Sequence, residues 1–262
     1  MGICRAADIS NWQNLTPSNA RALKASGVEL VIVRLSHEYQ QLINTARAQC
    51  KMVLDAGMHL QGYVWAYFTE APVAAASYWH ALYDDIPLER VWVDCEAETR
   101  HRGTPAHNVE WLHAVLDGLQ PWPTGVYTGR WWWVPYMGNS KEFTEQPLWD
   151  ADYTGVPNLY PISLYGGWNR RYIHQYSGNG SLAGINPLDL DLADEAILGA
   201  GQVEEPVTDE QLEEMKRISQ DEIIFNLQKA LTVKRLPRAA REALQYGALP
   251  AAQTLARGFE PE

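Results

Sequence analysis

The chain has 262 residues, of which 46% are hydrophobic and 20% are charged, so its length permits one large barrel-type domain or one domain plus an appendage. A formal net charge of −11 argues against nucleic-acid binding, because proteins of that class neutralise phosphates with clustered Lys and Arg. No apolar run approaches the roughly 20 residues that span a bilayer, so no membrane span is expected.

Up to residue 200, short apolar runs alternate with amphipathic stretches, which is the pattern of an α/β architecture. The first half predicts strand 6–10, helix 18–26, strand 29–35, helix 43–56, strand 59–68, helix 71–82, strand 91–95 and helix 106–118. The second half predicts strands at 123–128, 147–152, 162–165 and 172–176, with little helix between them. This order favours a single closed or nearly closed barrel over an open doubly wound sheet. No GxGxxG or GxxxxGK[ST] motif occurs at the expected places, so no nucleotide cofactor is expected.

The composition changes near Gly199-Ala200-Gly201, and the residues beyond this point predict helices. Thr208-Asp209-Glu210-Gln211 has the form of a capping box that begins a helix, and Pro237 lies where a second helix would start. We therefore expect a barrel over residues 1–200 and a helical region over 204–262. The helical region is expected to mediate self-association, giving a homo-oligomer, or attachment to a partner. Packing of its helices against the barrel is the alternative.

Two acidic residues mark the end of the predicted strand at 91–95. Because side chains alternate along a strand, Asp94 and Glu96 point to one face and Cys95 points to the other. In a parallel barrel the C-terminal ends of the strands form the mouth of the active site, so both acids are expected there. Two carboxylates so close together repel each other, which lets one stay protonated as a proton donor while the other stays ionised. A pair of solvated surface acids is the competing interpretation.

Two further acids support a site at this place. Asp8 lies where the first strand should finish, and Asp189 lies close to the end of the barrel segment. If the barrel closes, its first and last strands approach each other, and these two acids join Asp94 and Glu96 around a single pocket. A pair of carboxyl groups is what glycoside hydrolysis uses, so the acids predict a sugar-cleaving enzyme.

A series of short motifs resembles glycoside hydrolase family 25, the lysozymes often found as phage lytic enzymes. The series runs through residues 3–197 in the family's order, and it is this order, more than any single motif, that is specific. Its members are Asp8-Ile9-Ser10, Val31-Ile32-Val33-Arg34, Ala56-Gly57, Gly62-Tyr63, Asp94-Cys95-Glu96, Gly125-Val126-Tyr127-Thr128, Trp149-x-Ala151-x-Tyr153, His174-Gln175-Tyr176 and Leu188-Asp189-Leu190-Asp191.

The resemblance implies an irregular β/α barrel with fewer helices than strands. It also implies cleavage of the β-1,4 bond between N-acetylmuramic acid and N-acetylglucosamine in bacterial peptidoglycan, with retention of configuration. Carried over to this sequence, Glu96 would be the general acid, and Asp94 would stabilise positive charge or orient the substrate's acetamido group. Asp8 and Asp189 would hold this arrangement and tune the proton affinity of Glu96. Whether a protein carboxylate or the substrate's own N-acetyl group attacks the sugar stays open.

Six further residues are expected to bind the substrate. Aromatic rings offer flat surfaces on which the C–H faces of sugars stack, while packing in the core is the competing interpretation at each position. Two of the residues share a face of the strand at 59–68, three match aromatic positions of the family, and one is the amide of its Trp-Gln-Tyr motif. They are Tyr63, Trp65, Tyr127, Trp149, Tyr153 and Gln175.

Two departures from the family's pattern are expected close to the pocket. His174 replaces the usual Trp, and Asp191 stands where Asn is frequent. We expect such changes to alter the substrate preference or the pH optimum without removing the acid.

Other chemistries receive less support. Cys4, Cys50 and Cys95 form no CxxC pair and are expected as free, mostly buried thiols, and the acids beside Cys95 would weaken it as a nucleophile by raising its pKa. The acids could instead hold Mg²⁺ or Ca²⁺ in a metal-dependent deacetylase, but the histidines at 101, 107 and 113 do not share a helix face, so no metal is expected. A non-catalytic carbohydrate-binding or virion structural protein on the same barrel remains as the alternative of another class.

No apolar signal-peptide run follows Met1. We therefore expect synthesis in the cytoplasm, as in a phage-infected bacterium, with action on the cell wall after release. An enzyme carried on a particle fits the same observation.

Overall fold

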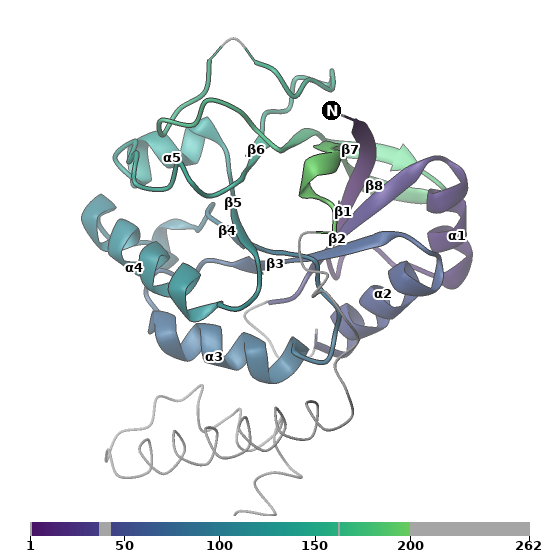
Figure 1. The fold of residues 1–262 in the computed structure, drawn as a ribbon, viewed down its shortest axis with the longest axis horizontal. Coiled ribbons are helices and arrows are strands. Elements are labelled where there is room, and N and C mark those ends of the chain that lie inside the picture. The colour runs from purple at the N-terminus through teal and green to yellow at the C-terminus, as the bar shows by residue number, and fades with distance from the viewer. Residues whose placement is uncertain (1, 37–42, 162, 200–262) are drawn as a thin grey trace, which may run out of the picture. The chain divides into compact units, whose positions relative to one another are not determined.

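Eight strands close into one barrel in the computed structural model, which describes residues 2–36, 43–161 and 163–199 (Figure 1). In these residues the strands are β1 (Ile3–Ile9), β2 (Val28–Arg34), β3 (His59–Trp65), β4 (Val91–Asp94), β5 (Thr124–Thr128), β6 (Leu148–Ala151), β7 (Ile173–Leu182) and β8 (Ile185–Asp194). Neighbouring strands from β1 through β7 pair in parallel, whereas β8 runs antiparallel to both β7 and β1. The predicted closed barrel is confirmed.

Five α-helices lie around the outside of the barrel in the described part of the chain, fewer than the strands, as predicted (Figure 1). They are α1 (Pro17–Ala25), α2 (Ile43–Asp55), α3 (Pro72–Tyr83), α4 (Pro105–Gly118) and α5 (Arg130–Tyr136), with 3₁₀ turns η2 (Thr99–His101) and η3 (Glu195–Ile197). The sequence sets two of the helix starts directly. Thr16 and Thr104 precede a proline, and the hydroxyl of each accepts a hydrogen bond from a backbone N–H of the first turn.

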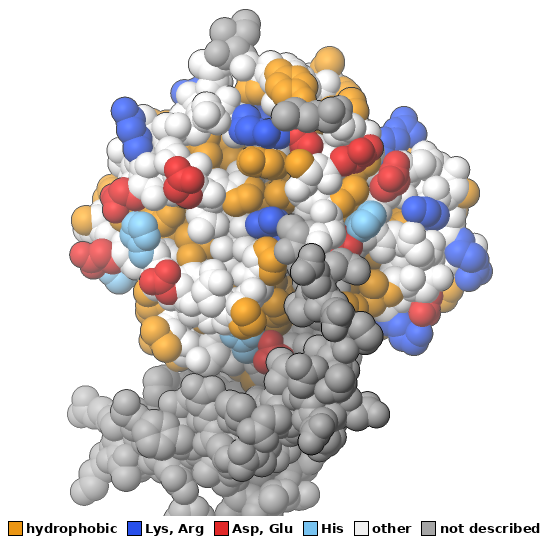
Figure 2. Space-filling model, viewed as in Figure 1, with side chains coloured by type: hydrophobic (Ala, Val, Ile, Leu, Met, Phe, Trp, Pro, Cys, Tyr) orange, Lys and Arg blue, Asp and Glu red, His pale blue; other side chains and the backbone are white. Residues whose placement is uncertain are grey.

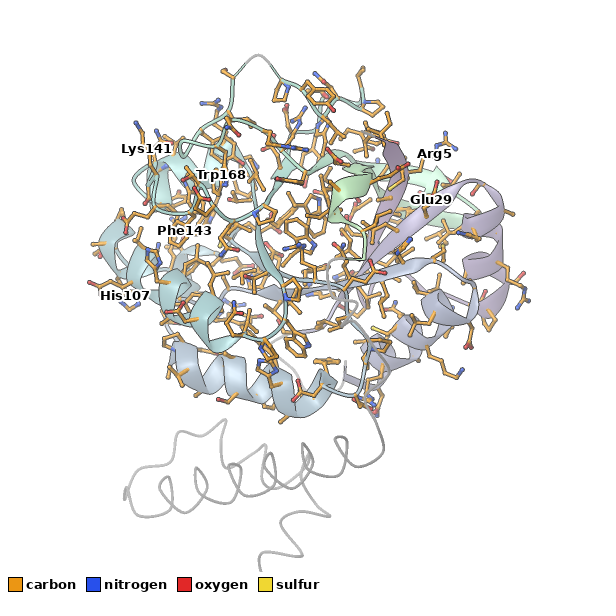
Figure 3. All side chains as sticks on the ribbon, in the orientation of Figure 1. Arg5, Glu29, His107, Lys141, Phe143 and Trp168 are labelled. Atoms are coloured by element: carbon orange, nitrogen blue, oxygen red, sulfur yellow. The ribbon has the colours of Figure 1, made fainter. Side chains whose placement is uncertain are left out.

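Alternation along the strands divides the apolar residues into two layers. In β2, Leu30 and Ile32 face the barrel interior with Trp92, while Val31 and Val33 face the helices. Burying a side chain of this size stabilises the fold by about 1.5–3 kcal/mol. The outer layer continues to α5, beside which Figure 3 labels two aromatic residues. These are Phe143 and Trp168, whose ring centroids lie 5.6 and 4.7 Å from that of Trp133.

The predicted strand at 162–165 is wrong for the residues that the structure describes there, because residues 163–165 form a loop. The hydroxyl of Tyr165 donates to the backbone oxygen of Thr128 at 3.0 Å and to Oδ1 of Asp150 at 2.7 Å, and its ring packs in the outer layer. A short apolar run has the same appearance in a strand and in a loop that covers a core. The strand that closes the barrel is instead β8, which was not among the predicted strands.

The predicted helical region at 204–262 lies outside the described residues and stays a prediction. In the described part of the chain, every helix is too short or too polar to cross a membrane. Figure 2 shows Asp and Glu side chains interspersed with Lys and Arg on the visible face of the barrel.

Candidate active site

A cavity of about 100 Å³ opens at the end of the barrel where the parallel strands finish. Nine of the ten predicted site residues line it, namely Asp8, Tyr63, Asp94, Glu96, Tyr127, Trp149, Tyr153, Gln175 and Asp189. They come from seven strands and from the loops that directly follow β4 and β6. The remaining predicted residue, Trp65, does not line the cavity.

The backbone fixes the direction of the two acids at the end of β4. Asp94 is the last residue of the strand and pairs with Trp65 on one side and Tyr127 on the other. The extended pairing continues for one more residue, because the N–H of Cys95 donates to the oxygen of Tyr127 at 2.8 Å and Thr128 Oγ1 donates to the oxygen of Cys95 at 2.8 Å. Alternation therefore turns Cys95 into the outer layer and brings Glu96 back to the cavity.

Burial dominates the electrostatics of these two acids. It raises the pKa of Glu96 to about 7, against the opposing charge of Arg34 and with the help of Asp189. The pKa of Asp94 is raised well above its usual range by burial and then by the charge of Glu96, and Arg34 again opposes the shift. Oδ1 of Asp94 is buried and accepts no hydrogen bond from the described residues. A proton is thus retained at this pair near neutral pH, and one oxygen is open to a donor from outside.

The other two predicted acids meet across the β1 and β8 strands. Asp8 and Asp189 are direct partners in the antiparallel register, so their side chains leave the sheet on the same face. The amide nitrogen of Gln175 donates to Oδ2 of Asp8 at 2.6 Å. Burial raises the pKa of Asp8 well above its usual range, and the charges of Asp191 and Asp189 add to the shift. The pKa of Asp189 is also raised by burial, while a hydrogen bond with Asp8 lowers it.

Gln175 connects the acids to the aromatic walls. Its Oε1 accepts hydrogen bonds from the hydroxyl groups of Tyr127 at 2.8 Å and Tyr153 at 3.0 Å. The ring of Trp149 stands edge-on to those of Tyr63 and Tyr127, with centroids 6.0 and 4.5 Å apart. These rings are buried except that of Tyr153, which is 56% exposed and forms the rim of the cavity. The walls therefore offer ring faces and hydroxyl groups together, which suits a sugar.

Trp65 lies beside the site in contact with a cation. The guanidinium carbon of Arg34 lies 4.8 Å from the centre of the Trp65 ring and 6.0 Å from that of Tyr63. Arg34 was not among the predicted site residues. It is the last residue of β2, and the C-terminal ends of barrel strands are where site residues are expected, so its position could have identified it. It is the cation that lowers the pKa values of Asp94 and Glu96.

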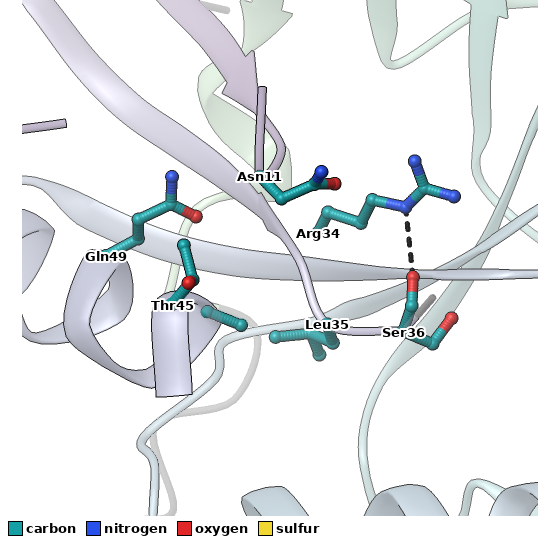
Figure 4. A pocket seen from close by; sticks show the side chains of 7 residues that line it. Asn11, Arg34, Leu35, Ser36, Thr45 and Gln49 are labelled. Carbon is teal, nitrogen blue, oxygen red and sulfur yellow. Dashed lines mark hydrogen bonds between the residues drawn. The ribbon is translucent and has the colours of Figure 1, made fainter. Parts of the chain in front are cut away.

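A smaller cavity of about 10 Å³ adjoins Arg34 (Figure 4). Asn11, Leu35, Ser36, Thr45, Ala46 and Gln49 form the rest of its wall, and Figure 4 shows Nε of Arg34 bonded to the backbone oxygen of Ser36, at 3.0 Å. Its size suffices for about one water molecule. The larger cavity with the acids is therefore the one that a sugar ring would use.

The two departures from the family's pattern have different surroundings. His174 does not line the cavity. Its Nδ1 accepts from the N–H of Asn158 at 3.0 Å, its Nε2 lies 2.8 Å from the oxygen of Asp152, and burial lowers its pKa, so it is held neutral. Asp191 is 1% exposed and faces the barrel interior, where Nε1 of Trp149 donates to its Oδ1 at 2.8 Å.

Two competing chemistries find little support in the structure. The described residues contain no group of three or more His, Cys, Asp and Glu side chains arranged to hold a metal ion. The thiols of Cys4, Cys50 and Cys95 are free and buried, as predicted. Burial and the neighbouring acids raise the pKa of Cys95 well above its usual range, which leaves it a poor nucleophile.

A family model described as glycosyl hydrolases family 25 matches residues 7–185, which is more than half of the chain. Among curated relatives, the chain is similar to "Probable GH family 25 lysozyme 4" of Dictyostelium discoideum, with 36% identity over 97 residues. That match covers 36% of this chain and 45% of the relative, so the chain spans about half the length of the curated relatives that it matches first.

Solved structures show the same fold. One is a muramidase from Trichobolus zukalii, 21% identical, which covers 75% of this chain and 99% of its own, with a TM-score of 0.61. Another is the catalytic domain of an endolysin from bacteriophage P40 of Listeria monocytogenes, also 21% identical, with coverage of 75% and 95% and a TM-score of 0.58. At these identities the likeness establishes the barrel.

Proposed function

Because this chain belongs to glycosyl hydrolase family 25, we propose that it is a peptidoglycan hydrolase, an N-acetylmuramidase of the lysozyme type. Its substrate is the β-1,4 bond between N-acetylmuramic acid and N-acetylglucosamine. The observation that carries the proposal is the buried pair Asp94 and Glu96 in the cavity, with both pKa values raised. An acid that still holds its proton near neutral pH is what a leaving glycosidic oxygen needs.

Substrate binding decides which of the two acids carries the proton. The free pair keeps one proton near neutral pH, because a second negative charge at this buried place is unfavourable. The open Oδ1 of Asp94 is a natural acceptor for the acetamido N–H of the sugar. A hydrogen bond to the charged form lowers the pKa of Asp94, so the proton stays on Glu96. Glu96 is then the general acid.

In the proposed mechanism, bond breaking takes place in two steps that retain the configuration, with the substrate's acetamido group as the nucleophile. The acetamido oxygen attacks C1 of N-acetylmuramic acid, the C1–O bond breaks, and the leaving oxygen takes the proton of Glu96. The ionised Asp94 stabilises the positive charge that develops on the acetamido group. The Glu96 carboxylate then removes a proton from water, and the water oxygen attacks C1 while the bond between C1 and the acetamido oxygen breaks, which restores the acetamide.

Mass spectrometry of fragments released from purified peptidoglycan tests the proposal. Wild type is expected to produce fragments with a new reducing end at N-acetylmuramic acid. Glu96→Gln keeps the shape but has no proton to give, so release should fall by about 10²–10⁴-fold. Glu98→Gln is the matched control, because Glu98 lies two residues further on, is exposed and pairs with Arg100 at the surface.

Three results would contradict the proposal. Equal release by wild type and Glu96→Gln would remove Glu96 from its role as the acid. A new reducing end at N-acetylglucosamine would show that another bond is cut. Binding to peptidoglycan without any release by wild type would favour the non-catalytic, carbohydrate-binding alternative.

A further inference from the structure

A second cluster of carboxyl groups adjoins the cavity on the antiparallel side of the barrel. Asp8 comes from β1, and Asp189 and Asp191 come from β8. In the register of these strands Asp8 is opposite Asp189, and Asp191 is opposite Ala6, one diagonal step away. Leu188 and Leu190 point to the outer layer, so the aspartates between and beyond them point inward. Asp8 and Asp191 are thus neighbours on one face of adjacent strands.

Asp8 and Asp191 each accept a hydrogen bond at one carboxylate oxygen. Gln175 donates to Oδ2 of Asp8 at 2.6 Å, and Trp149 donates to Oδ1 of Asp191 at 2.8 Å. Oδ2 of Asp191 is buried and accepts no hydrogen bond from an N–H or hydroxyl group of the described residues. Asp8 is 3% exposed and Asp191 is 1% exposed. A buried carboxylate oxygen without a donor is unfavourable, so the neighbouring carboxyl group is the place where a donor must be sought.

We infer that Asp8 and Asp191 share one proton, which sits on Asp8 and donates a hydrogen bond to the open oxygen of Asp191. Asp191 is thereby a positioning residue that holds Asp8 neutral and in place at the wall of the cavity. Its consequence for catalysis rests on the proposed function, whereas the sharing of the proton does not.

The electrostatics of the pair agree with a shared proton. Burial raises the pKa of both groups, that of Asp191 to about 8. The charge of Asp191 raises the pKa of Asp8 further, as expected for two carboxyl groups close enough to hold one proton between them. Because the two groups interact strongly, the proton belongs to the pair.

Among the described residues, no cation acts on the pKa values of the pair. The titratable side chains that face the pair or sense its charge come from β8 itself and from four other places in the barrel, and each of them is an acid or a neutral phenol at pH 7. They are Asp189 on β8, Tyr63 on β3, Tyr127 on β5, Tyr153 after β6 and Tyr176 on β7. The guanidinium of Arg34 acts instead on Asp94 and Glu96. At Asp8 and Asp191 a shared proton therefore offsets negative charge, as the cation Arg34 does at Asp94 and Glu96.

The substitution Asp191→Asn removes the carboxyl group that shares the proton but keeps a polar side chain of the same shape. The amide oxygen still accepts from Trp149, and the amide N–H replaces the shared proton as a fixed donor, now directed to Asp8. Asp8 then ionises at a lower pH, while the pair keeps one negative charge near neutral pH. The matched control is Asp194→Asn, because Asp194 lies on the same strand, is equally buried and pairs with Arg170.

NMR titration of the full chain with ¹³C-labelled aspartate carboxyl groups measures the sharing directly. Asp94 is also expected to titrate high, so the readout is the difference between variants. Asp191→Asn should remove the signal of Asp191 and should move a second signal, that of Asp8, which is still protonated at pH 7 in wild type, to lower pH. Asp194→Asn should leave the Asp8 titration in place. An Asp8 signal that titrates at the same pH in wild type and in Asp191→Asn would overturn the inference.

Unfolding measured against pH gives a second test without turnover. Both pKa values are raised in the folded state, so the folded chain keeps protons that the unfolded chain releases. The stability that this gives is complete below the unfolded pKa of about 4 and is lost as the pH rises toward about 8. Asp191→Asn should flatten the decline of the unfolding midpoint over this range. Parallel curves for wild type and variant would contradict a shared proton.

A variant that does not fold still leaves the question decidable. Asp8→Asn is the mirror experiment, because it offers a fixed donor to Asp191 and should lower the pKa of that group below that of wild type. An unchanged Asp191 titration would overturn the inference.

Kinetics give a further readout. As the pH rises, kcat/KM should decrease with the loss of two protons from the wild-type enzyme and with the loss of one proton from Asp191→Asn. An inactive protein that passes the titration test refutes the proposed function alone, and an active one that fails it refutes the shared proton alone.

Discussion

The barrel presents its acids in two different ways. On the parallel side, Asp94 and Glu96 come at the end of β4, where the strand gives way to a loop. On the antiparallel side, Asp189 and Asp191 come from within β8, which pairs on both of its edges, and Asp8 pairs with Asp189 one residue before β1 ends. Strand ends are open to substrate and water, whereas the middle of a ladder is not. The first pair is therefore placed for proton transfer, and the second group is placed to hold the site in shape.

Hydrogen bonding follows the same division. The open oxygen of Asp94 awaits a donor, while Asp8 and Asp191 are each held by a side chain of the barrel wall, Gln175 and Trp149. Removal of a side chain that holds an acid on the antiparallel side is therefore expected to act through geometry and stability. A change of charge beside the acids on the parallel side is expected to act through the pH dependence of the reaction.

Substitution of Gln175 tests the holding role and has the largest expected effect. Gln175→Met keeps the volume but leaves Asp8 and Tyr127 without their shared partner, at a cost of about 1–3 kcal/mol for each buried group. We expect a fall of about 2–5 kcal/mol in the free energy of unfolding, measured with urea, together with a loss of activity. Gln146→Met is the control, because this amide accepts from Thr124 in a less buried place. An equal fall in the free energy of unfolding of both variants would contradict the role of Gln175 in holding Asp8 and Tyr127.

The sequence predicted the parallel side of the site well, for a physical reason. Alternation along a strand is local, so the directions of Asp94, Cys95 and Glu96 follow from seven consecutive residues. The meeting of Asp8 with Asp189 required only that the barrel close. The same rule, applied one residue before Gln175, would have shown that His174 points away from the cavity.

The antiparallel side was harder to predict because its signals are weaker. In β8 the alternation of leucines with aspartates predicts a strand only if inward-facing acids are accepted, and acids are uncommon in a barrel interior. The apolar run at 162–165 has the clearer strand pattern, although residues 163–165 form a loop. The hydrogen bond from Trp149 to Asp191 joins residues 42 positions apart, and no spacing rule reaches that far. The contact of Arg34 with Trp65, a residue that does not line the cavity, is likewise visible only in three dimensions.

Substitution of Arg34 sharpens the comparison from the parallel side. Arg34 lowers the pKa values of Asp94 and Glu96, so Arg34→Gln should raise both. Glu96 then keeps its proton to higher pH, and the alkaline limb of kcat/KM should move up, by about one pH unit at most for a half-buried cation. Arg34→Lys, which keeps the charge, should restore most of the wild-type profile. A limb that moves down, or equally in both variants, would contradict the electrostatic role.

The smallest effects are expected at the two tyrosine hydroxyl groups that donate to Gln175. Both donate to the same oxygen, so they compare a buried donor with an exposed one. Tyr127 is 5% exposed and Tyr153 is 56% exposed, yet both donate to Oε1 of Gln175. Tyr127→Phe removes a donor where no water replaces it, so the free energy of unfolding should fall by about 1 kcal/mol. At the rim water takes the place of the lost hydroxyl, so Tyr153→Phe should change it by less than about 0.5 kcal/mol. Urea unfolding of both variants at one pH measures the difference, and a larger loss in Tyr153→Phe would mean that the rim, more than the buried wall, holds Gln175 against Asp8.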